Sequence, residues 1–340
     1  MDLIKPLSTA NNGKLRVGLI GLGKMGMLHA SLLSVLPNVQ LVALCDKSRL
    51  MRFFAKRTLD GPLVTDNMAK LSGLNLDAVY VTTPIQSHYN VIKEIFERNL
   101  SRNVFTEKTL SSSYSKSEEL LKLATAAGGV TMVGYMKRFS VTFNKVKQLL
   151  NQKSLGDLLS FEAYAYSSDF ADAKPGSSIS VARGGVLEDL GSHVIDLAIW
   201  FFEDLTVSSA KIQSLIAPDS ADSAEFKVLC SNDIKGSFAV SWVETGYRMP
   251  EFGFNIKGTD GSITVNDSKV TLNLKNAKQE QWYRQDLNDN VFFLLGDPEY
   301  YRENENFISC IVNHEKTESD FQTALKVDYL LDQVERKAND

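Results

Sequence analysis

The stretch "VGLIGLGKMGMLHA", residues 17–30, contains three glycines with the spacing Gly21-x-Gly23-x-x-Gly26. They follow an apolar run that predicts a strand and open a pattern that predicts a helix, which is the context of a dinucleotide-binding turn. The first glycine permits the tight turn, the second lets a pyrophosphate approach the backbone, and the third lets helix and strand pack closely. The helix N-terminus is then left to receive the negative charge.

An acidic residue supports the same interpretation. Asp46 in "LVALCDKS" lies about 20 residues beyond the glycines, at the end of a second predicted strand, where a carboxylate accepts hydrogen bonds from the adenosine ribose. The charge of Asp46 also repels a 2′-phosphate and so favours NAD, whereas Lys47 and Arg49 leave NADP open. We expect NAD as the cofactor.

The composition is that of an ordinary globular protein. The chain has 340 residues, a length that favours two domains, with 44% apolar and 23% charged residues and a formal net charge of -4. This balance gives no reason to expect nucleic acid as a partner. Residues 1–14 contain no apolar run long enough for a signal peptide or a membrane span, so we expect a cytoplasmic protein without a membrane partner.

The three cysteines lie far apart in the sequence. Cys45, Cys230 and Cys310 fit neither a disulfide framework nor a metal clip. They are expected to be buried thiols in a reducing compartment.

The two halves of the chain have different hydrophobic patterns. From about residue 14 to 137, apolar runs alternate with amphipathic helical stretches, which predicts a doubly wound parallel sheet of the Rossmann type. Beyond about residue 155, strand follows strand, which predicts an open, mostly antiparallel sheet. We therefore expect an α/β Rossmann domain over residues 1–137 and an α+β domain for substrate binding and oligomerisation over residues 138–340. The final segment predicts a helix that begins with a capping box at Ser319 and Gln322.

Three further segments go beyond a generic dinucleotide fold. They are "VTTPIQSH" at residues 81–88, "VFTEK" at 104–108 and "GGVLEDLGSHVIDLAIW" at 184–200. Taken in order with the glycine motif, they resemble the Gfo/Idh/MocA oxidoreductase family, which includes glucose-fructose oxidoreductase and inositol dehydrogenases. The resemblance covers nearly the whole chain.

The resemblance implies an NAD(P)-dependent oxidoreductase that moves a hydride between the nicotinamide and the CH–OH carbon of a sugar, a sugar derivative or a cyclitol. It also implies a homodimer or homotetramer. Two other activities within the superfamily stay open, a non-catalytic cofactor-binding regulator and an NAD-dependent glycosidase. The residues expected to bind the cofactor are Gly21, Gly23, Lys24, Met25, Gly26, Asp46, Lys47, Thr82, Thr83, Pro84, His88, Glu107 and Lys108.

A catalytic constellation is expected around a helix in residues 188–202. In such a helix Leu190, Val194, Leu197 and Phe201 form an apolar stripe, and Asp189, His193 and Asp196 form a second stripe that edges a cleft. A single histidine near a helix is often only structural, but Asp189 lies one turn from His193.

The resemblance implies a catalytic role for Lys108, Asp189 and His193. His193 would take the hydroxyl proton, Lys108 would stabilise the developing alkoxide, and Asp189 would bind a neighbouring hydroxyl or orient His193. Asp189 and His193 could also be half of a metal site, but no third ligand has a convincing spacing, so no metal is expected.

Three residues, two at the domain boundary and one beyond it, are weaker candidates for substrate binding. Lys137 and Arg138 in "GYMKRF" could bind substrate oxygens or form a salt bridge across the domain boundary. Tyr247 lies near the tyrosine-bearing substrate strand of the family. His29, within the helix after the glycines, is expected only to pack.

One departure from the family concerns the strand-end motif, which usually reads Glu-Lys-Pro. Here it reads Glu107-Lys108-Thr109. Because a cis bond before a residue other than proline costs about 3 kcal/mol, the Lys108–Thr109 bond is predicted to be trans.

Overall fold

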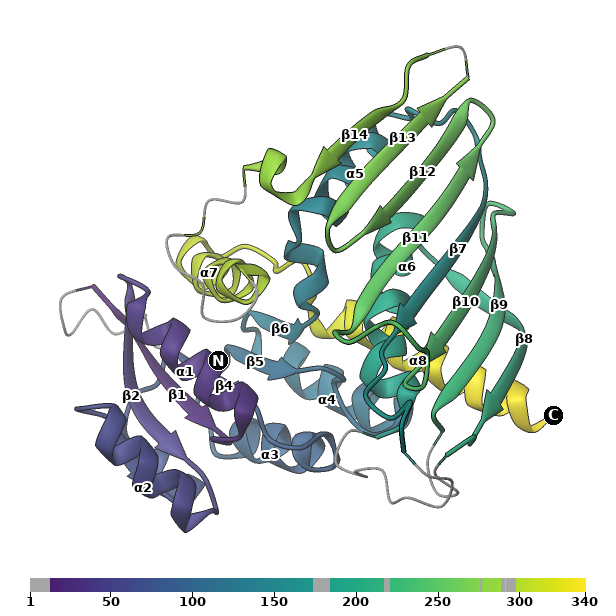
Figure 1. Ribbon diagram of the computed structural model, residues 1–340. Coiled ribbons are helices and arrows are strands. Elements are labelled where there is room, and N and C mark those ends of the chain that lie inside the picture. The colour runs from purple at the N-terminus through teal and green to yellow at the C-terminus, as the bar shows by residue number, and fades with distance from the viewer. Residues whose placement is uncertain (1–12, 174–183, 217–220, 276, 289–290, 292–297) are drawn as a thin grey trace. The chain divides into compact units, whose positions relative to one another are not determined.

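The computed structural model describes residues 13–173, 184–216, 221–275, 277–288, 291 and 298–340. The chain divides into two compact units (Figure 1). The first comprises residues 1–134 and 293–325, and the second comprises residues 135–292 and 326–340. Within the described residues, no helix is long and apolar enough to cross a membrane.

The first unit is built on a six-stranded sheet. Its strands are β1 (Leu15–Ile20), β2 (Val39–Cys45), β3 (Leu63–Thr65), β4 (Ala78–Val81), β5 (Val104–Glu107) and β6 (Thr131–Gly134). They are hydrogen-bonded in the order β3-β2-β1-β4-β5-β6, and every pair is parallel. The strand order reverses between β1 and β4, and ligands of doubly wound sheets bind at the carboxyl ends of the strands beside such a point.

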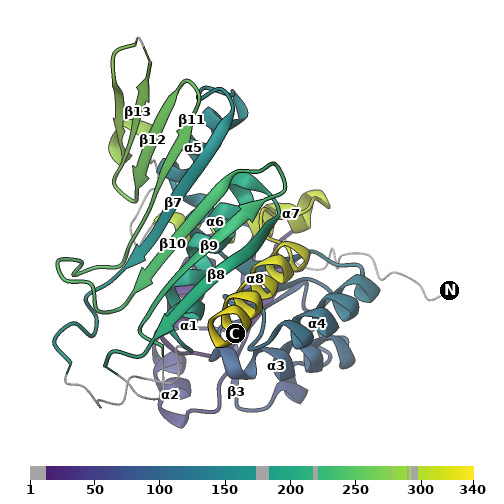
Figure 2. The same ribbon diagram turned by 90° about the vertical axis from the view of Figure 1, so that its right-hand side faces the viewer.

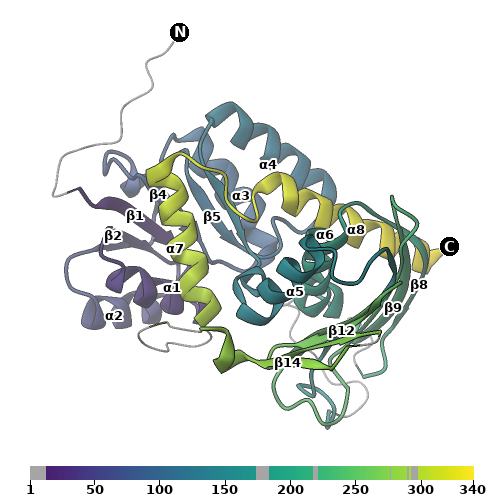
Figure 3. The same ribbon diagram turned by 90° about the horizontal axis from the view of Figure 1, so that it is seen from above.

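Helices cover both faces of this sheet, as predicted. They are α1 (Lys24–Val35), α2 (Arg49–Thr58), α3 (Ile85–Glu97), α4 (Tyr114–Ala127) and α7 (Pro298–Asn313), with a 3-10 turn η1 (Met68–Leu71). Figure 3 shows α1, α2 and α7 over one face and α3 and α4 over the other. Because the sheet is covered on both sides, its strands are apolar along nearly their whole length, and Val17, Val79 and Phe105 have no exposed surface.

The second unit is built on an eight-stranded sheet. Its strands are β7 (Leu158–Tyr166), β8 (Leu205–Gln213), β9 (Ser223–Cys230), β10 (Lys235–Ser241), β11 (Glu251–Gly258), β12 (Gly261–Asn266), β13 (Lys269–Leu274) and β14 (Glu280–Tyr283). They run in the order β14-β13-β12-β11-β7-β10-β9-β8. Only β7 and β10 pair in parallel among these strands, so the sheet is mostly antiparallel, as predicted.

One face of this second sheet carries the helices of the unit. The helical elements are η2 (Met136–Phe139), α5 (Val141–Asn151), a π-helical turn η4 (Leu187–Gly191), α6 (Ser192–Phe202), η5 (Arg284–Leu287) and the greater part of α8 (Phe321–Asn339). Phe161 and Phe254 point to the face covered by α5 and α6, whereas the alternate residues Glu162 and Asn255 point to the opposite face. In Figure 2 this opposite face is turned to the viewer, and no helix of the described chain crosses it.

The segment that contains α7 joins the first unit although it follows the second in sequence. The Val133 amide of β6 donates to the Ser319 carbonyl at 2.8 Å, and the Ser319 hydroxyl donates to the Val133 carbonyl at 2.7 Å. The two units therefore differ from the contiguous division at residue 137 that the sequence predicts. The predicted capping box at Ser319 is wrong because this hydroxyl bonds to the strand, and Asp320 instead accepts from the Thr323 amide at 2.8 Å.

Candidate active site

The three glycines of the first turn each meet a different steric demand. Gly21 has a φ of +100°, and a Cβ atom there would lie 2.7 Å from the Thr82 carbonyl carbon. A Cβ on Gly26 would lie 1.9 Å from the Gly21 oxygen, so only glycine allows β1 and α1 to approach this closely. A Cβ on Gly23 would meet nothing within 4 Å, which leaves open space beside the start of α1.

The N-terminus of α1 is suited to an anion. Gly23 is its N-cap, no side chain caps its amides, and its first turn has no acidic residue. The first amides of such a helix have no partner within the helix and favour negative charge. Lys24 is exposed and Met25 half-buried at the same end. The glycine turn and this helix end together fit the pyrophosphate of a dinucleotide.

Asp46 is held directly beside the glycine turn. Its Oδ2 accepts from the Leu22 amide at 2.5 Å, and its Oδ1 accepts from the Ser48 amide at 2.6 Å. A carboxylate with two backbone donors still has acceptor sites for ribose hydroxyls. Lys47 is exposed on the same loop, and Arg49 is exposed at the start of α2.

The ends of β4 and β5 are tied together by His88 of α3. Its Nδ1 lies 2.8 Å from the Thr109 carbonyl oxygen, and its Nε2 lies 2.8 Å from the Thr83 carbonyl oxygen. Burial lowers the pKa of His88 below its usual value of 6.5, so the neutral ring donates to one carbonyl at a time. Thr82 is buried and donates from Oγ1 to the Gly21 carbonyl at 2.7 Å, and Pro84 is the N-cap of α3.

Glu107 and Lys108 follow directly at the end of β5. The Glu107 carboxylate lies 2.9 Å from Nε2 of the buried His29, and its other oxygen accepts from the Lys108 amide at 3.3 Å. Lys108 is half-buried at the carboxyl edge of the sheet that also carries the glycine turn. His29, which the sequence assigned only to packing, is thus joined to this strand end. The sequence feature that could have indicated this contact is the position of His29. It is a polar residue three positions after Gly26, on the side of the helix that faces the sheet.

The Lys108–Thr109 peptide bond is cis, so the predicted trans bond is wrong. The prediction rested on the local cost of a cis bond before threonine and took no account of the contacts of Thr109. Thr109 is buried, its Oγ1 donates to the Ser111 carbonyl at 2.9 Å, and its own carbonyl faces His88. These contacts fix the backbone that follows Lys108.

In the second unit, Asp189 and His193 stand on either side of a change in helix type. Asp189 belongs to the π-helical turn η4, and His193 is the second residue of α6. Asp189 accepts a hydrogen bond from the Trp242 indole at 3.1 Å. His193 is 8% exposed, and its ring meets those of Phe252 and Tyr135 edge-on at 5.3 and 6.4 Å. π-Helical turns within α-helices are frequent at functional sites.

Asp196 does not edge a cleft as predicted, because it is fully buried with Arg138. The Arg138 guanidinium donates to the two Asp196 carboxylate oxygens at 2.7 Å each. Sequence analysis left two roles open for Arg138, substrate binding or a salt bridge across the domain boundary. The structure contains a salt bridge, but both of its residues belong to the second unit. Lys137 is also buried, and its Nζ lies 2.6 Å from Asp267.

Tyr247 lies in the turn between β10 and β11. Its backbone exchanges hydrogen bonds with Ser168, and its ring lies 5.2 Å from that of Tyr166. The three cysteines are free and buried, as predicted.

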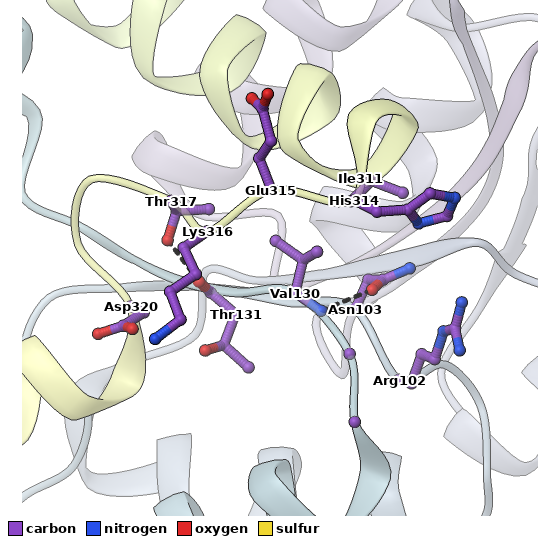
Figure 4. Close-up of a pocket in the computed structure, with 12 residues that line it drawn as sticks. Arg102, Asn103, Val130, Thr131, Ile311, His314, Glu315, Lys316, Thr317 and Asp320 are labelled. Atoms are coloured by element: carbon purple, nitrogen blue, oxygen red, sulfur yellow. Dashed lines mark hydrogen bonds between the residues drawn. The ribbon is translucent and has the colours of Figure 1, made fainter.

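A pocket of about 290 Å³ in the first unit lies away from the glycine turn (Figure 4). Arg102, Asn103, Val130 and Thr131 line it at the amino ends of β5 and β6, whereas dinucleotides bind at the carboxyl ends. Within the described part of the chain, no group of three or more His, Cys, Asp or Glu side chains could hold a metal ion.

Comparison with known proteins assigns the family. Residues 15–135 match the model described as the oxidoreductase family with an NAD-binding Rossmann fold, and residues 143–264 match the GFO/IDH/MocA C-terminal domain. The chain belongs to this family. The glycine turn and Asp46 lie within the residues that match the NAD-binding Rossmann fold of this family.

Similar GFO/IDH/MocA proteins cover most of the chain. The inositol 2-dehydrogenase of Rhizobium meliloti is 25% identical over 305 residues, which are 87% of this chain and 88% of the relative. The scyllo-inositol 2-dehydrogenase (NAD(+)) of Bacillus subtilis is 24% identical over 270 residues, 76% and 77% of the two chains. The structure of levoglucosan dehydrogenase in complex with NADH and levoglucosan has a TM-score of 0.85 at 19% identity, with 96% and 97% of the two chains covered. At 19% sequence identity, the similarity to levoglucosan dehydrogenase shows a shared fold and not a shared substrate.

Proposed function

We propose that this protein is a dehydrogenase that transfers a hydride between NAD and a CH–OH carbon of a polyhydroxylated ring, either a sugar, a sugar derivative or a cyclitol. The observation that carries the proposal is the position of Lys108, at the carboxyl end of β5 in the sheet whose glycine turn and Asp46 fit a dinucleotide. The names of the inositol and levoglucosan dehydrogenases support this class of substrate.

The residues of the first unit would divide the work of holding the cofactor. The glycine turn and the amides of α1 would bind the pyrophosphate, and Asp46 would accept from the ribose hydroxyls. Thr82, Thr83, Pro84 and His88 would shape the surroundings of the ring from the end of β4. When bound, NAD supplies the redox chemistry as a hydride carrier.

The remaining work is the movement of one proton and the stabilisation of one developing charge. We propose that His193 takes the proton of the substrate hydroxyl during oxidation and returns it during reduction. The Lys108 ammonium would stabilise the developing alkoxide, and Asp189 would bind a neighbouring hydroxyl or orient His193. Lys137, Arg138 and Tyr247 are weaker candidates, since the first two already pair with Asp267 and Asp196.

The substrate class can be tested by binding and turnover together. NAD, followed by sugars and cyclitols, would be added in a thermal-shift screen, since a ligand that binds only the native state raises the melting temperature. Each stabilising compound would then be tested for an increase in absorbance at the nicotinamide band. Stabilisation without reduction of NAD would favour a cofactor-binding regulator, and release of a sugar without accumulated NADH would favour a glycosidase.

We further propose that copies of the chain associate as a homodimer or homotetramer through the uncovered face of the second sheet. Tyr164 and Tyr166 lie half-exposed on β7 at this face, with their rings stacked 5.0 Å apart. Light scattering on native protein and on Tyr166→Lys would test this, because a buried lysine at such a contact should shift the protein toward monomer.

The three buried free thiols also fit a reducing compartment such as the cytoplasm.

A further inference from the structure

His29 is a polar side chain in the core of the first unit. It lies on α1 and has no exposed surface. Aromatic rings surround it, with the centroid of Phe105 at 5.0 Å, that of Tyr80 at 5.8 Å and that of Tyr300 at 6.1 Å. A side chain needed only to fill this space could be apolar, because burying a polar group costs free energy unless it is hydrogen-bonded.

Both ring nitrogens of His29 face oxygen atoms. Nε2 lies 2.9 Å from Oε1 of Glu107, and Nδ1 lies 3.1 Å from Oδ1 of Asn304. The orientation of the Asn304 amide is fixed because its Nδ2 donates to the Tyr300 carbonyl at 2.6 Å. The ring of His29 is therefore held between the Glu107 carboxylate and the Asn304 amide oxygen, one at each nitrogen.

The contacts of His29 lie inside the core of the first unit. The His29 side chain has no exposed surface, and the Glu107 side chain is 12% exposed. Because a buried polar group without a hydrogen-bond partner costs free energy, each contact constrains the side chains that make it.

The Glu107 contact connects His29 to the backbone of Lys108. While Oε1 of Glu107 faces His29, its Oε2 accepts from the Lys108 amide at 3.3 Å. On the other side of Lys108, the Thr109 carbonyl is held by His88 at 2.8 Å. Each neighbour of Lys108 is thus bonded to a buried histidine from a different helix, one on each face of the sheet.

We propose that His29 is a positioning residue for Lys108. Its contacts with Glu107 and Asn304 fix the Glu107 carboxylate, which in turn orients the Lys108 backbone. The catalytic consequence rests on the role proposed above for Lys108. Rates near an active site are sensitive to such positioning, since a misplacement of about 1 Å can cost about 100-fold.

Two amide variants separate the two hydrogen bonds. In His29→Gln the amide nitrogen occupies nearly the place of Nε2 and can still donate to Glu107, and in His29→Asn it occupies nearly the place of Nδ1 and can donate only to Asn304. Both replace the ring by a smaller amide, so they control for lost packing. Single-turnover hydride transfer, NADH affinity and melting temperature would be measured for each.

We expect His29→Asn to slow hydride transfer at least about tenfold and His29→Gln to stay within about threefold of native, with similar melting temperatures and NADH affinities for the two. Equal loss of rate in both variants, or a native rate in His29→Asn, would overturn the proposal. If His29→Asn does not fold, Glu107→Gln replaces it, because the amide cannot accept from both His29 and the Lys108 amide. The rate of Glu107→Gln should then fall at least about tenfold, and a native rate would contradict the proposal.

The variant Lys108→Met separates the failure of this inference from the failure of the proposed function. A native hydride-transfer rate in Lys108→Met would contradict the proposed function. A slow Lys108→Met together with a native rate in His29→Asn would contradict the positioning role of His29 alone.

Discussion

The Asp46 carboxylate accepts a hydrogen bond from the Leu22 amide at 2.5 Å, so the end of the second strand is joined directly to the glycine turn. Its second oxygen is held by the Ser48 amide. The carboxylate of Asp46 is therefore fixed in position beside the glycine turn, where we propose that it accepts from the adenosine ribose.

A fixed negative charge at this place should discriminate against the 2′-phosphate of NADP. We expect native protein to bind NADH at least about tenfold more tightly than NADPH, a difference of about 1.4 kcal/mol. Asp46→Asn keeps an oxygen for the Leu22 amide but removes the charge, so it should narrow this difference mainly by improving NADPH binding. Fluorescence titration of the two cofactors checks both expectations. Equal or tighter NADPH binding by native protein would show that Lys47 and Arg49 outweigh Asp46.

His88 should make the stability of the first unit depend on pH. Its pKa is lowered by burial in the folded protein and is near 6.5 in the unfolded chain. Between these two values the unfolded chain binds more protons, so the free energy of unfolding should fall as the pH falls below about 6.5. Urea unfolding at a series of pH values should show a smaller fall for His88→Gln, which keeps a hydrogen-bond donor but does not titrate. Parallel pH profiles for the two proteins would contradict this expectation.

The buried ion pair of Arg138 and Asp196 should contribute to the stability of the folded protein and not to substrate binding. Arg138→Met leaves the carboxylate buried without its partner, which costs about 3–5 kcal/mol in comparable sites. The double variant Arg138→Met, Asp196→Leu removes both charges and should recover most of that loss. Chemical denaturation measures both. If Arg138→Met were as stable as native but bound substrate poorly, the substrate-binding role would replace the structural one.

The elements that sequence predicts well are those decided by local patterns. The Rossmann sheet, the glycine turn and Asp46 follow from apolar runs, glycine spacing and a single acidic residue at a strand end. In β9, apolar and polar residues alternate in the sequence, and buried and exposed side chains alternate in the structure. Ala224, Phe226 and Val228 face the core.

The features that were missed depend on residues far apart in the chain. His29 contacts Glu107 and Asn304, which are 78 and 275 positions away, and Arg138 pairs with Asp196 at a separation of 58. A period of 3.6 residues identifies the buried face of a helix but not the polar partner that a residue on it will meet. The cis Lys108–Thr109 bond was likewise missed, because residue type alone favours the trans form.

We propose that Lys108 and His193 serve one proton transfer coupled to hydride transfer, and single-turnover absorbance at the nicotinamide band tests this role most directly. Lys108→Met keeps the aliphatic stem without the charge, His193→Ala removes the base, and Lys56→Met at an exposed lysine of α2 is the control. We predict a loss of at least about 100-fold in the rate for each of the first two variants. NADH affinity should change little.

The double variant Lys108→Met, His193→Ala decides whether the two residues act together. Because both would serve the same proton, its rate should fall far less than the product of the two single losses. Lys56→Met should keep the native rate. Native rates in both single variants with a verified substrate would contradict the account.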